Sequence, residues 1–306
     1  MFRKRWLKIR NSEPIPIIHQ LGAANMNILI TGASGFIGEQ LIRHLSGQHQ
    51  LIGMSRSPVK GNAAAVRGCF DRFEDLSMLD RYRIDAVVHL AAVTGGCSEE
   101  DALAVNVQGT RRLFRYLLDR GCRRFVAASS IAAVGSLDSA FVPRQLPMPD
   151  DYAFEGTDAY GWSKWLVEQL CRYLHRQTSD ADFVSLRFGS VEPDHWEPPH
   201  VDTHSDLSIP FVQLGKVYAS DVVGGIASVL ESPGRPRAAV YNLVGPDIGS
   251  GIPAAQMLQA WLKSHPAQLH LDYYAQPGHE FKPLYDMERM KSDFGFTPAR
   301  STRRAT

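Results

Sequence analysis

The chain has 306 residues, of which 44% are hydrophobic and 21% are charged. These values are typical of a globular protein that can bury a large core, in one α/β domain or in one domain with an added lobe. A formal net charge of +1 excludes a dedicated nucleic-acid-binding protein, and no apolar run is long enough to cross a membrane.

The cysteines give no sign of a metal site or a disulfide framework. They lie far apart, without a CxxC pair, at Cys69, Cys97, Cys122 and Cys171. We therefore expect reduced thiols that mostly pack in the interior, a cytoplasmic location and no bound metal.

Both ends of the chain differ in composition from the rest. Five Lys or Arg lie between positions 3 and 10, and residues 1–25 contain no apolar core like that of a secretory signal. We expect a flexible extension there, with a basic arm for a membrane surface or a targeting segment as the alternative. The folded part would begin at Met26, and residues 299–306 would form a loose basic tail.

A glycine-rich turn follows the first apolar segment. Residues 27–30 predict a buried parallel strand, and residues 39–46 have apolar positions at helical spacing. Between them, Gly32 permits a tight turn, Gly35 lets the backbone approach a pyrophosphate, and Gly38 lets the helix pack closely on the strand. The helix N-terminus then faces the negative charge. This order predicts a dinucleotide site with first contacts at Gly32, Ser34, Gly35, Phe36, Ile37 and Gly38.

The second predicted strand, residues 50–54, ends where such a site contacts the adenosine ribose. An acidic side chain there accepts from the 2′-hydroxyl of NAD, whereas a nearby Arg suits the 2′-phosphate of NADP. Ser55 stands where the acid would be and Arg56 follows it, which favours NADP over NAD unless Arg56 is an ordinary surface residue. After a weak third strand predicted over residues 66–70, Asp71 or Asp75 could meet the adenine amino group.

Residues 84–92 predict an apolar fourth strand that ends in small side chains. Leu90, Ala91 and Ala92 would let a flat cofactor lie against the strand end, and they would equally allow simple close packing. His89, inside the strand, is expected to be a hydrogen-bonded core histidine and not a catalyst.

The next helix and strand carry polar residues among apolar ones. Asn106 interrupts the apolar face of a helix predicted over residues 102–118. A buried amide needs partners, so Asn106 would order an active-site water or a lysine, or brace a neighbouring strand. A fifth strand over residues 124–128 would deliver Ser129 and Ser130 to the carboxyl edge of the sheet, where ligands bind in open α/β sheets.

Tyr160 and Lys164 lie four residues apart at the start of a further helix and therefore share one helical face. A phenol has a pKa of about 10 and is a poor base at neutral pH, but a lysine ammonium and an oxidised nicotinamide ring would lower its pKa. Such pairs also occur by chance on helix surfaces. The glycine turn and the serines at the strand end, which precede this pair, favour a functional interpretation of it over chance.

In this order the motifs resemble those of the short-chain dehydrogenase/reductase superfamily, in its extended branch of NAD(P)-dependent epimerases, dehydratases and reductases. The resemblance covers residues 26–298. Its landmarks are Thr31 to Gly38, His89-Leu90-Ala91-Ala92, Asn106 to Thr110, Ser129-Ser130, Tyr160-Gly161-Trp162-Ser163-Lys164, Leu186 to Val191, Tyr218 to Val222 and Asp286 to Pro298.

The resemblance implies roles for the polar residues. Tyr160 would be the acid/base, Lys164 would lower its pKa and bind the nicotinamide ribose, and Ser130 would hydrogen-bond the reacting oxygen. Ser130 is preferred to Ser129 because it lies five residues before Gly135, which is the register of the family.

The resemblance also places Asn106 in the catalytic group and Phe188 and Ser190 near the cofactor. Many nucleotide-sugar epimerases have Asn in place of Ser190, so this residue weakens a nucleotide-sugar assignment. The segment around Phe188 is similar to that of uronate dehydrogenases, which oxidise free sugar acids. Where 4,6-dehydratases carry an Asp-Glu pair, this chain has Ile131-Ala132, so dehydration is not expected.

We therefore expect an α/β fold, a Rossmann-type doubly wound parallel sheet with a small C-terminal substrate-binding lobe. Asp221 would cap a late helix, and residues 192–208 would form a mobile loop over the substrate instead of a metal site. The expected division is a nucleotide-binding domain at 26–188 and 217–246, and a lobe at 189–216 and 247–298.

The predicted activity is reversible hydride transfer between NADP or NAD and a secondary alcohol or carbonyl of a sugar or sugar nucleotide. The alternative within this class is a uronate- or aldose-type dehydrogenase acting on a free sugar acid. The alternative from another class is a non-catalytic NAD(P)-sensing module. The expected partner is the small-molecule substrate, with no nucleic acid or membrane, and a homodimer stays open.

Overall fold

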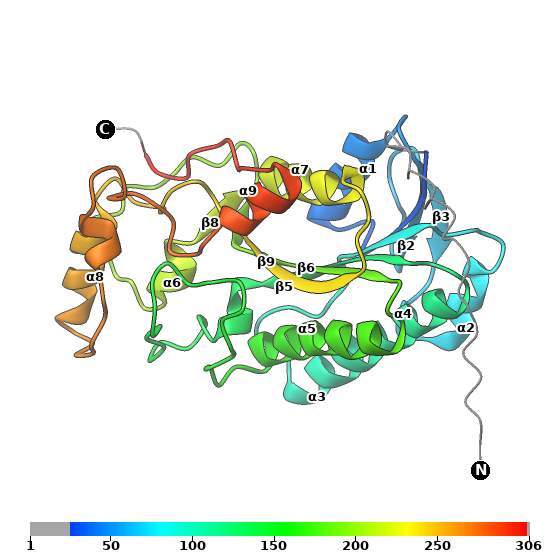
Figure 1. The fold of residues 1–306 in the computed structure, drawn as a ribbon, viewed down its shortest axis with the longest axis horizontal. Coiled ribbons are helices and arrows are strands. Elements are labelled where there is room, and N and C mark those ends of the chain that lie inside the picture. Colours follow the sequence, from blue (N-terminus) through cyan, green and yellow to red (C-terminus); the bar gives the residue numbers. More distant parts are fainter. Residues whose placement is uncertain (1–24, 305–306) are drawn as a thin grey trace, which may run out of the picture.

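The structure is a computed structural model that describes residues 25–304. Its central sheet consists of seven parallel strands (Figure 1). Apart from Asn25, the expected extension at residues 1–25 lies outside the described part. The strand order is β3-β2-β1-β4-β5-β6-β9, so the chain reverses its direction of travel between β1 and β4. The strands are β1 (Asn27–Thr31), β2 (Gln50–Ser55), β3 (Ala64–Arg67), β4 (Ala86–His89), β5 (Arg124–Ser130), β6 (Asp182–Phe188) and β9 (Arg237–Leu243). This is the doubly wound parallel sheet that the sequence predicts.

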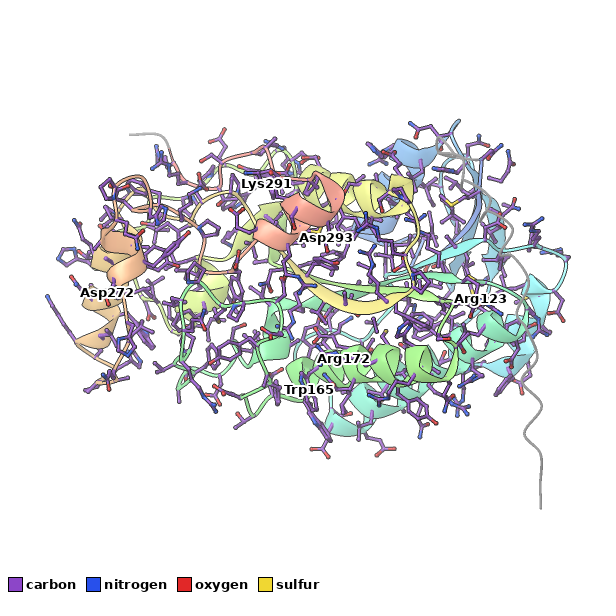
Figure 2. All side chains as sticks on the ribbon, in the orientation of Figure 1. Arg123, Trp165, Arg172, Asp272, Lys291 and Asp293 are labelled. Carbon is purple, nitrogen blue, oxygen red and sulfur yellow. The ribbon has the colours of Figure 1, made fainter. Side chains whose placement is uncertain are left out.

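Helices cover both faces of this sheet. Helices α1, α7 and α9 lie on one face, and α2, α4 and α5 lie on the other (Figure 1). Figure 2 shows Trp165 and Arg172 along α5 and Lys291 and Asp293 on α9. The helices are α1 (Phe36–Leu45), α2 (Phe73–Leu76), α3 (Glu99–Asp101), α4 (Thr110–Asp119), α5 (Ala159–Gln177), α6 (Pro210–Gln213), α7 (Ala219–Glu231), α8 (Ala254–Leu262) and α9 (Glu288–Phe294).

The two helical layers explain the continuous apolar runs of the central strands. Consecutive side chains of a strand point to opposite faces, and in β1 both faces are covered. Ile28 and Ile30 therefore pack in the core under α1 and α7, while Leu29 packs in the core under α4 and α5. All three side chains are fully buried.

The structure changes the helix predicted over residues 102–118. Its first half is a π-helix, η2 (Ala102–Gly109), and α4 follows directly. The Thr110 hydroxyl donates to the carbonyl oxygen of Asn106 at 2.5 Å, where the two segments meet. Widened turns of this kind are frequent at functional sites, and this one carries Asn106.

A two-stranded parallel ladder, β7 (Ser190–Glu192) with β8 (Lys216–Tyr218), packs Val217 in the core of the main sheet, and a smaller lobe forms around helices α6 and α8. Its apolar core includes residues 131–152, which we had expected in the nucleotide-binding domain. This segment leaves the end of β5 through the 3₁₀ turns of η3 (Ile131–Val134) and packs its apolar side chains against the lobe. Two further short helices are η1 (Ser77–Leu79) and η4 (Asp272–Ala275).

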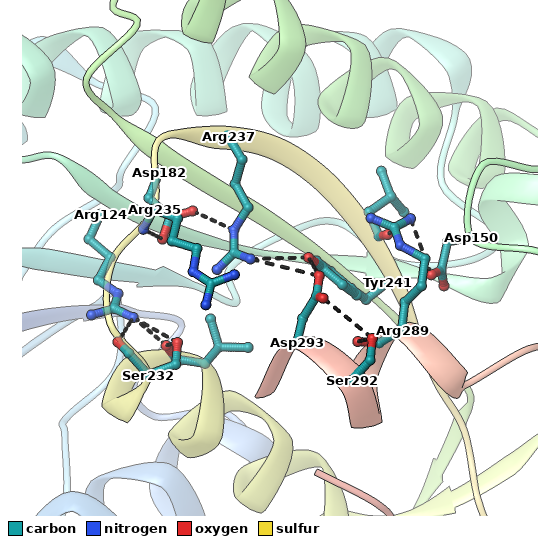
Figure 3. Close-up of polar contacts among 12 residues, drawn as sticks. Arg124, Asp150, Asp182, Ser232, Arg235, Arg237, Tyr241, Arg289, Ser292 and Asp293 are labelled. Atoms are coloured by element: carbon teal, nitrogen blue, oxygen red, sulfur yellow. Dashed lines mark hydrogen bonds and ion pairs between the residues drawn. The ribbon is translucent and has the colours of Figure 1, made fainter. Parts of the chain in front are cut away.

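Helix α9 belongs to the sheet, although the expected division placed it in the lobe. Phe294 packs in the core of the sheet face that α1 and α7 cover, and its ring meets the Tyr241 ring edge-on. Figure 3 shows the polar contacts: the Tyr241 hydroxyl donates to Asp293 at 2.7 Å, and Arg237 bridges Asp293 and Asp182. Helix α9 therefore extends this helical layer over the edge strand β9.

The expectation of a loose tail at residues 299–306 is wrong for its described part. Backbone N–H groups of Ala299 and Arg300 donate to the two carboxylate oxygens of Asp221 at 2.9 and 3.1 Å. Asp221 therefore binds the tail and does not cap α7, which begins without a side-chain cap. Thr302 is fully buried and donates from its backbone to Asp247 at 2.9 Å. We call residues 299–303 the C-terminal strap.

The strap also reaches the segment after β7. The Arg300 guanidinium donates to the carboxylate and the backbone carbonyl of Asp194, both at 2.8 Å, and stacks on the Tyr218 ring at 3.8 Å. The Tyr218 hydroxyl donates to the carbonyl of Trp196 at 3.2 Å. The beginning of the expected substrate loop is thus fastened to both β8 and the strap.

Candidate functional site

The glycine turn has the close backbone packing that its sequence predicts. Gly32 has a φ of +68°, and a Cβ atom there would lie 2.9 Å from the backbone nitrogen of Ala91. The Gly35 N–H donates to the Gly32 carbonyl at 2.9 Å. At Gly38 a Cβ would lie only 2.3 Å from the Gly32 carbonyl oxygen, so helix α1 rests directly on the turn.

A cavity of about 390 Å³ opens beside this turn, over the carboxyl ends of β1, β2 and β4. It lies at the point where the strand order reverses, which is where open α/β sheets bind nucleotides. Nine of the expected cofactor residues line it: Gly32, Ser34, Gly35, Ser55, Arg56, Asp71, Leu90, Ala91 and Ala92. The sequence reasoning missed other lining residues, which are Thr31, Met54, Ser57, Gly68, Cys69, Phe70, Arg72, Val93 and Val105.

The rim of the cavity at β2 is polar. The hydroxyls of Ser34 and Ser55 are hydrogen-bonded at 2.5 Å, and the exposed Arg56 and Arg72 lie on the same rim. Two guanidinium groups at this position suit a phosphate on the adenosine ribose. The glycine cradle, the apolar floor and this rim together fit the adenosine half of a dinucleotide.

The two candidate adenine carboxylates differ in their surroundings. Asp71 lines the cavity, whereas Asp75 accepts a hydrogen bond from the Cys69 backbone at 2.7 Å and holds the loop after β3. Asp71 is thus the candidate that faces the cavity.

His89 is a core residue, as expected. Its ring nitrogens are hydrogen-bonded to the hydroxyls of Thr31 at 2.7 Å and Thr110 at 2.9 Å. Burial lowers the pKa of His89 to about 3, and the Lys164 ammonium acts in the same direction. The imidazole therefore stays neutral and ties the end of β1 to α4.

Asn106 acts as a brace between the cavity and α5. Its carbonyl oxygen accepts from the Val93 N–H at 2.9 Å, and its amide donates to the Val93 carbonyl at 3.0 Å and to the Ser163 hydroxyl at 2.9 Å. Of the roles considered for Asn106, the structure shows the bracing one. It links the cavity wall at Val93 to the residue beside Lys164.

Ser130, Tyr160 and Lys164 meet at the carboxyl end of β5. Helix α5 begins here because the Asp158 carboxylate accepts from the Gly161 N–H at 2.5 Å. The Lys164 ammonium donates to the Ala128 carbonyl at 2.8 Å and lies 5.6 Å from the centre of the Tyr160 ring. Ser130, whose hydroxyl accepts from the Ala132 N–H at 3.1 Å, lies close enough to the Tyr160 phenol to lower its pKa. The structure therefore brings the three expected side chains together.

The pKa of Tyr160 differs from the expectation. Burial raises it to about 12, an interaction with Ser130 opposes the rise, and the negative charge of Asp158 adds to it. Burial lowers the pKa of Lys164 to about 8. The lysine does not lower the phenol pKa here because an amine with a pKa of about 8 is already neutral at the pH at which a phenol with a pKa of about 12 ionises.

Not all the expected cofactor residues lie against the cavity. Phe36 is exposed at the first turn of α1, and Ile37 and Gly38 pack on the sheet side of that helix. Phe188 is buried in the core, and Ser190 donates from its backbone to Gly215 at the start of β7. None of these five lines the cavity, and neither Tyr160 nor Lys164 does.

A buried ion pair under α5 was missed. Glu168 and Arg187 are joined by two hydrogen bonds of 2.7 and 2.8 Å, and their side chains are 0% and 1% exposed. Ser129 donates to the same carboxylate at 2.6 Å. The signal was present in the sequence, since Glu168 lies one helical turn after Lys164 and an arginine inside a buried strand needs an acidic partner.

Residues 25–304 contain neither a cluster of metal-ligating side chains nor a membrane-spanning helix. No group of three or more His, Cys, Asp or Glu in this range has the geometry of a metal site. None of its helices combines the length and the hydropathy needed to span a bilayer.

Comparisons with known proteins support the family that the motifs suggest. UDP-glucose 4-epimerase 2 of Arabidopsis thaliana is 26% identical over 184 residues, which is 53% of this chain and 51% of that protein. An NAD-dependent glucose-6-phosphate dehydrogenase of Haloferax volcanii is 28% identical over 189 residues, which is 56% of this chain and 70% of that protein. The chain spans about half the length of the curated epimerases that it matches.

A solved structure shows the same fold. The short-chain dehydrogenase/reductase superfamily protein of Agrobacterium tumefaciens, with bound NAD, superposes with a TM-score of 0.64 at 23% identity, over 90% of this chain and 93% of that one. The sequence profile of the NAD dependent epimerase/dehydratase family matches residues 28–208, which is more than half of the chain. The chain therefore belongs to the NAD dependent epimerase/dehydratase family.

Proposed function

We propose that the chain catalyses reversible hydride transfer between NAD(P) and a secondary alcohol or carbonyl of a sugar or sugar derivative. The observation that carries the proposal is the meeting of Ser130, Tyr160 and Lys164 at the carboxyl end of β5. Asn106 connects Ser163, the residue before Lys164, to the cavity wall at Val93. A polar cluster beside a concave site at a sheet switch point is the arrangement expected of an active site.

Each side chain has a chemical task in this proposal. Ser130 holds the substrate oxygen by a hydrogen bond, and the Tyr160 phenol exchanges a proton with that oxygen. Lys164 supplies a fixed positive charge beside the phenol. NAD(P), when bound, supplies the site that accepts or returns the hydride. The residues shown to line the cavity would bind its adenosine half.

The cofactor is proposed to be NADP in preference to NAD. Arg56 and Arg72 on the rim of the cavity support this choice, because no carboxylate follows β2 to accept from a ribose hydroxyl. Replacing Arg56 by Ala should weaken NADP binding about ten-fold or more and leave NAD binding nearly unchanged, since an arginine–phosphate contact is strong and specific. Arg43→Ala, an exposed arginine on α1 outside the cavity, is the matched control.

The substrate class rests on the relatives. Their names include a UDP-glucose epimerase and a dehydrogenase acting on glucose 6-phosphate, so both a nucleotide sugar and a simpler sugar are candidates. Ser190 stands where many nucleotide-sugar epimerases have Asn, which favours a smaller sugar or a free sugar acid as the substrate. A nicotinamide absorbance screen with UDP-sugars, sugar phosphates and uronic acids separates these classes.

A first experiment tests the enzyme itself. The purified protein is examined for retained dinucleotide by mass spectrometry and then assayed at the nicotinamide absorbance band. Tyr160→Phe should lower turnover by about a hundred-fold or more, because it removes the proton-transfer group, and should leave cofactor affinity nearly unchanged. Tyr173→Phe, an exposed tyrosine on the same helix, should change neither.

The outcomes distinguish the alternatives. Tightly retained cofactor would favour an epimerase, and freely exchanging cofactor would favour a dehydrogenase. Cofactor binding without turnover on any sugar, together with an unaffected Tyr160→Phe protein, would support an NAD(P)-sensing module. A cytoplasmic location, a homodimer and the division into a nucleotide-binding domain and a substrate lobe are also part of the proposal, and light scattering tests the dimer.

A further inference from the structure

We propose that the buried Glu168–Arg187 pair is a positioning device, which fixes the helix that carries Tyr160 and Lys164 against strands β5 and β6 and sustains the charge on Lys164. The inference rests on the proposed function for its catalytic meaning. Neither residue of the pair touches the reacting atoms in it.

The pair joins every element that carries a catalytic side chain. Glu168 lies one turn after Lys164 and two turns after Tyr160, on the same helical face. Its carboxylate accepts from Ser129, the neighbour of Ser130. On the other side of the ladder, Arg187 stands opposite Ser129 in the register of β5 and β6.

Arg187 also holds the approach to the helix. Its guanidinium donates to the backbone carbonyl of Tyr152 at 2.9 Å, in the segment that leads to α5. One further nitrogen of Arg187, Nη1, is buried without a hydrogen-bond partner among the described residues. Movement of either charged side chain would therefore displace β5, β6 and the entry to α5 together.

Stability alone does not account for this pair. Desolvating two charges offsets much of their attraction, and apolar side chains of similar volume often stabilise a protein as well or better. A buried pair of this kind fixes the relative positions of the elements that it joins, because its bidentate contacts permit only one arrangement of them.

The charge on Lys164 depends on the groups that face it. Tyr160 and Glu168 face it from α5, and His89 from β4 stays neutral. Arg187 from β6 is bonded to Glu168 and partly neutralises it. Burial disfavours the ammonium and the Glu168 carboxylate favours it, so Glu168 is the group that keeps the lysine protonated near neutral pH.

The test measures the lysine directly and uses the full chain. The sequence has eight lysines, so a protein labelled with ¹³C at the lysine Cε gives few signals, and Lys164→Arg identifies the one that disappears. Glu168→Gln should lower the Lys164 pKa by about 1 to 2 units, as expected for removing a unit charge about 6 Å away while the Arg187 charge remains. The upper limb of the pH–kcat profile should move to lower pH by the same amount.

The matched control lies on the same strand. Asp182, at the amino end of β6, forms a largely buried pair with Arg237 at 2.9 Å (Figure 3). In the register of β5 and β6 it stands opposite Arg124, at the other end of the ladder from Ser130. Asp182→Asn should lower the melting temperature to a similar degree and leave the Lys164 pKa and kcat nearly unchanged. If Glu168→Gln lowers only the melting temperature and its Lys164 pKa matches the wild type, the pair is structural and the proposal is wrong.

The proposal can still be tested if the variant does not fold or if the wild type lacks hydride transfer. If Glu168→Gln does not fold, the double variant Glu168→Gln, Arg187→Met removes both charges, and an unchanged Lys164 pKa in that protein also overturns the proposal. The lysine titration needs neither cofactor nor substrate. A wild type without hydride transfer but with a Glu168-dependent Lys164 pKa would refute the proposed function and leave the electrostatic coupling standing.

Discussion

Replacing Gly38 by Ala tests how the glycine turn forms the cofactor site. The added Cβ would lie 2.3 Å from the Gly32 carbonyl oxygen and 2.9 Å from the Ala33 Cα. Both neighbours are backbone atoms, so no side chain can rotate away. Because ordinary contact begins at 3.4 Å, helix α1 must move away from the turn by about 1 Å.

This displacement should have two measurable effects. Overpacking of this kind costs about 1 to 3 kcal/mol, which lowers the melting temperature by roughly 2 to 6 °C in a chain of this size. The N–H groups at the start of α1 would also lose their distance to a bound pyrophosphate. Since a charged hydrogen bond contributes about 1.5 to 3 kcal/mol, NADPH affinity should fall about 10- to 100-fold.

Fluorescence titration with NADPH and a thermal melt measure both effects on the same samples. The matched control is Gly47→Ala, just after the other end of α1, where φ is +87° and no heavy atom lies within 4 Å of the added Cβ. It should lose about 1 to 2 kcal/mol from backbone strain without any loss of cofactor affinity. A Gly38→Ala protein that binds NADPH as tightly as the wild type would refute the assignment of the turn as the pyrophosphate site.

Three other outcomes are expected. Between pH 6.5 and 5 the free energy of unfolding should fall by about 2 kcal/mol. The reason is that His89 takes up a proton in the unfolded chain but not in the folded protein, where its pKa is about 3. Urea titrations of His89→Gln should show a smaller fall. Burial raises the pKa of the Cys122 thiol to about 12, so a thiol reagent at pH 8 should modify the less buried Cys97 first, and peptide mapping that finds Cys122 modified first in the native protein would contradict its burial. Truncation after Pro298 removes two backbone donors from the buried Asp221 carboxylate and should cost about 2 to 4 kcal/mol in calorimetry, whereas an unchanged melting temperature would show that the strap contributes nothing.

The sequence was sufficient for the sheet and for the cavity because both depend on local patterns. Apolar runs bounded by glycines mark buried parallel strands, and the turn at Gly32 follows from steric limits on a few residues. The cluster of Ser130, Tyr160 and Lys164 could also be predicted from the sequence, since each residue lies at the end of a strand or the start of a helix. The edge strand β3 was placed only approximately, because it has one neighbour and only one buried residue, Val66.

The failures concern contacts between distant segments. The strap binds Asp221 across 78 residues of sequence, and no local pattern marks such a pair. The Glu168–Arg187 pair joins a helix to a strand whose separation depends on packing. The pKa of Tyr160 depends on burial by surrounding elements, which the spacing to Lys164 does not reveal. The packing of apolar residues between 131 and 152 in the lobe was missed for the same reason, because this segment follows β5 directly in the sequence.

The C-terminal strap has a consequence for anyone who exchanges substrate lobes between relatives to alter specificity. Asp194, Asp221 and Asp247 come from three different stretches of chain, and all three hold the same five residues. A chimera that takes its lobe from one parent and its last residues from another would leave carboxylates without their donors. Such a chimera should take the carboxyl-terminal residues and the lobe from the same parent.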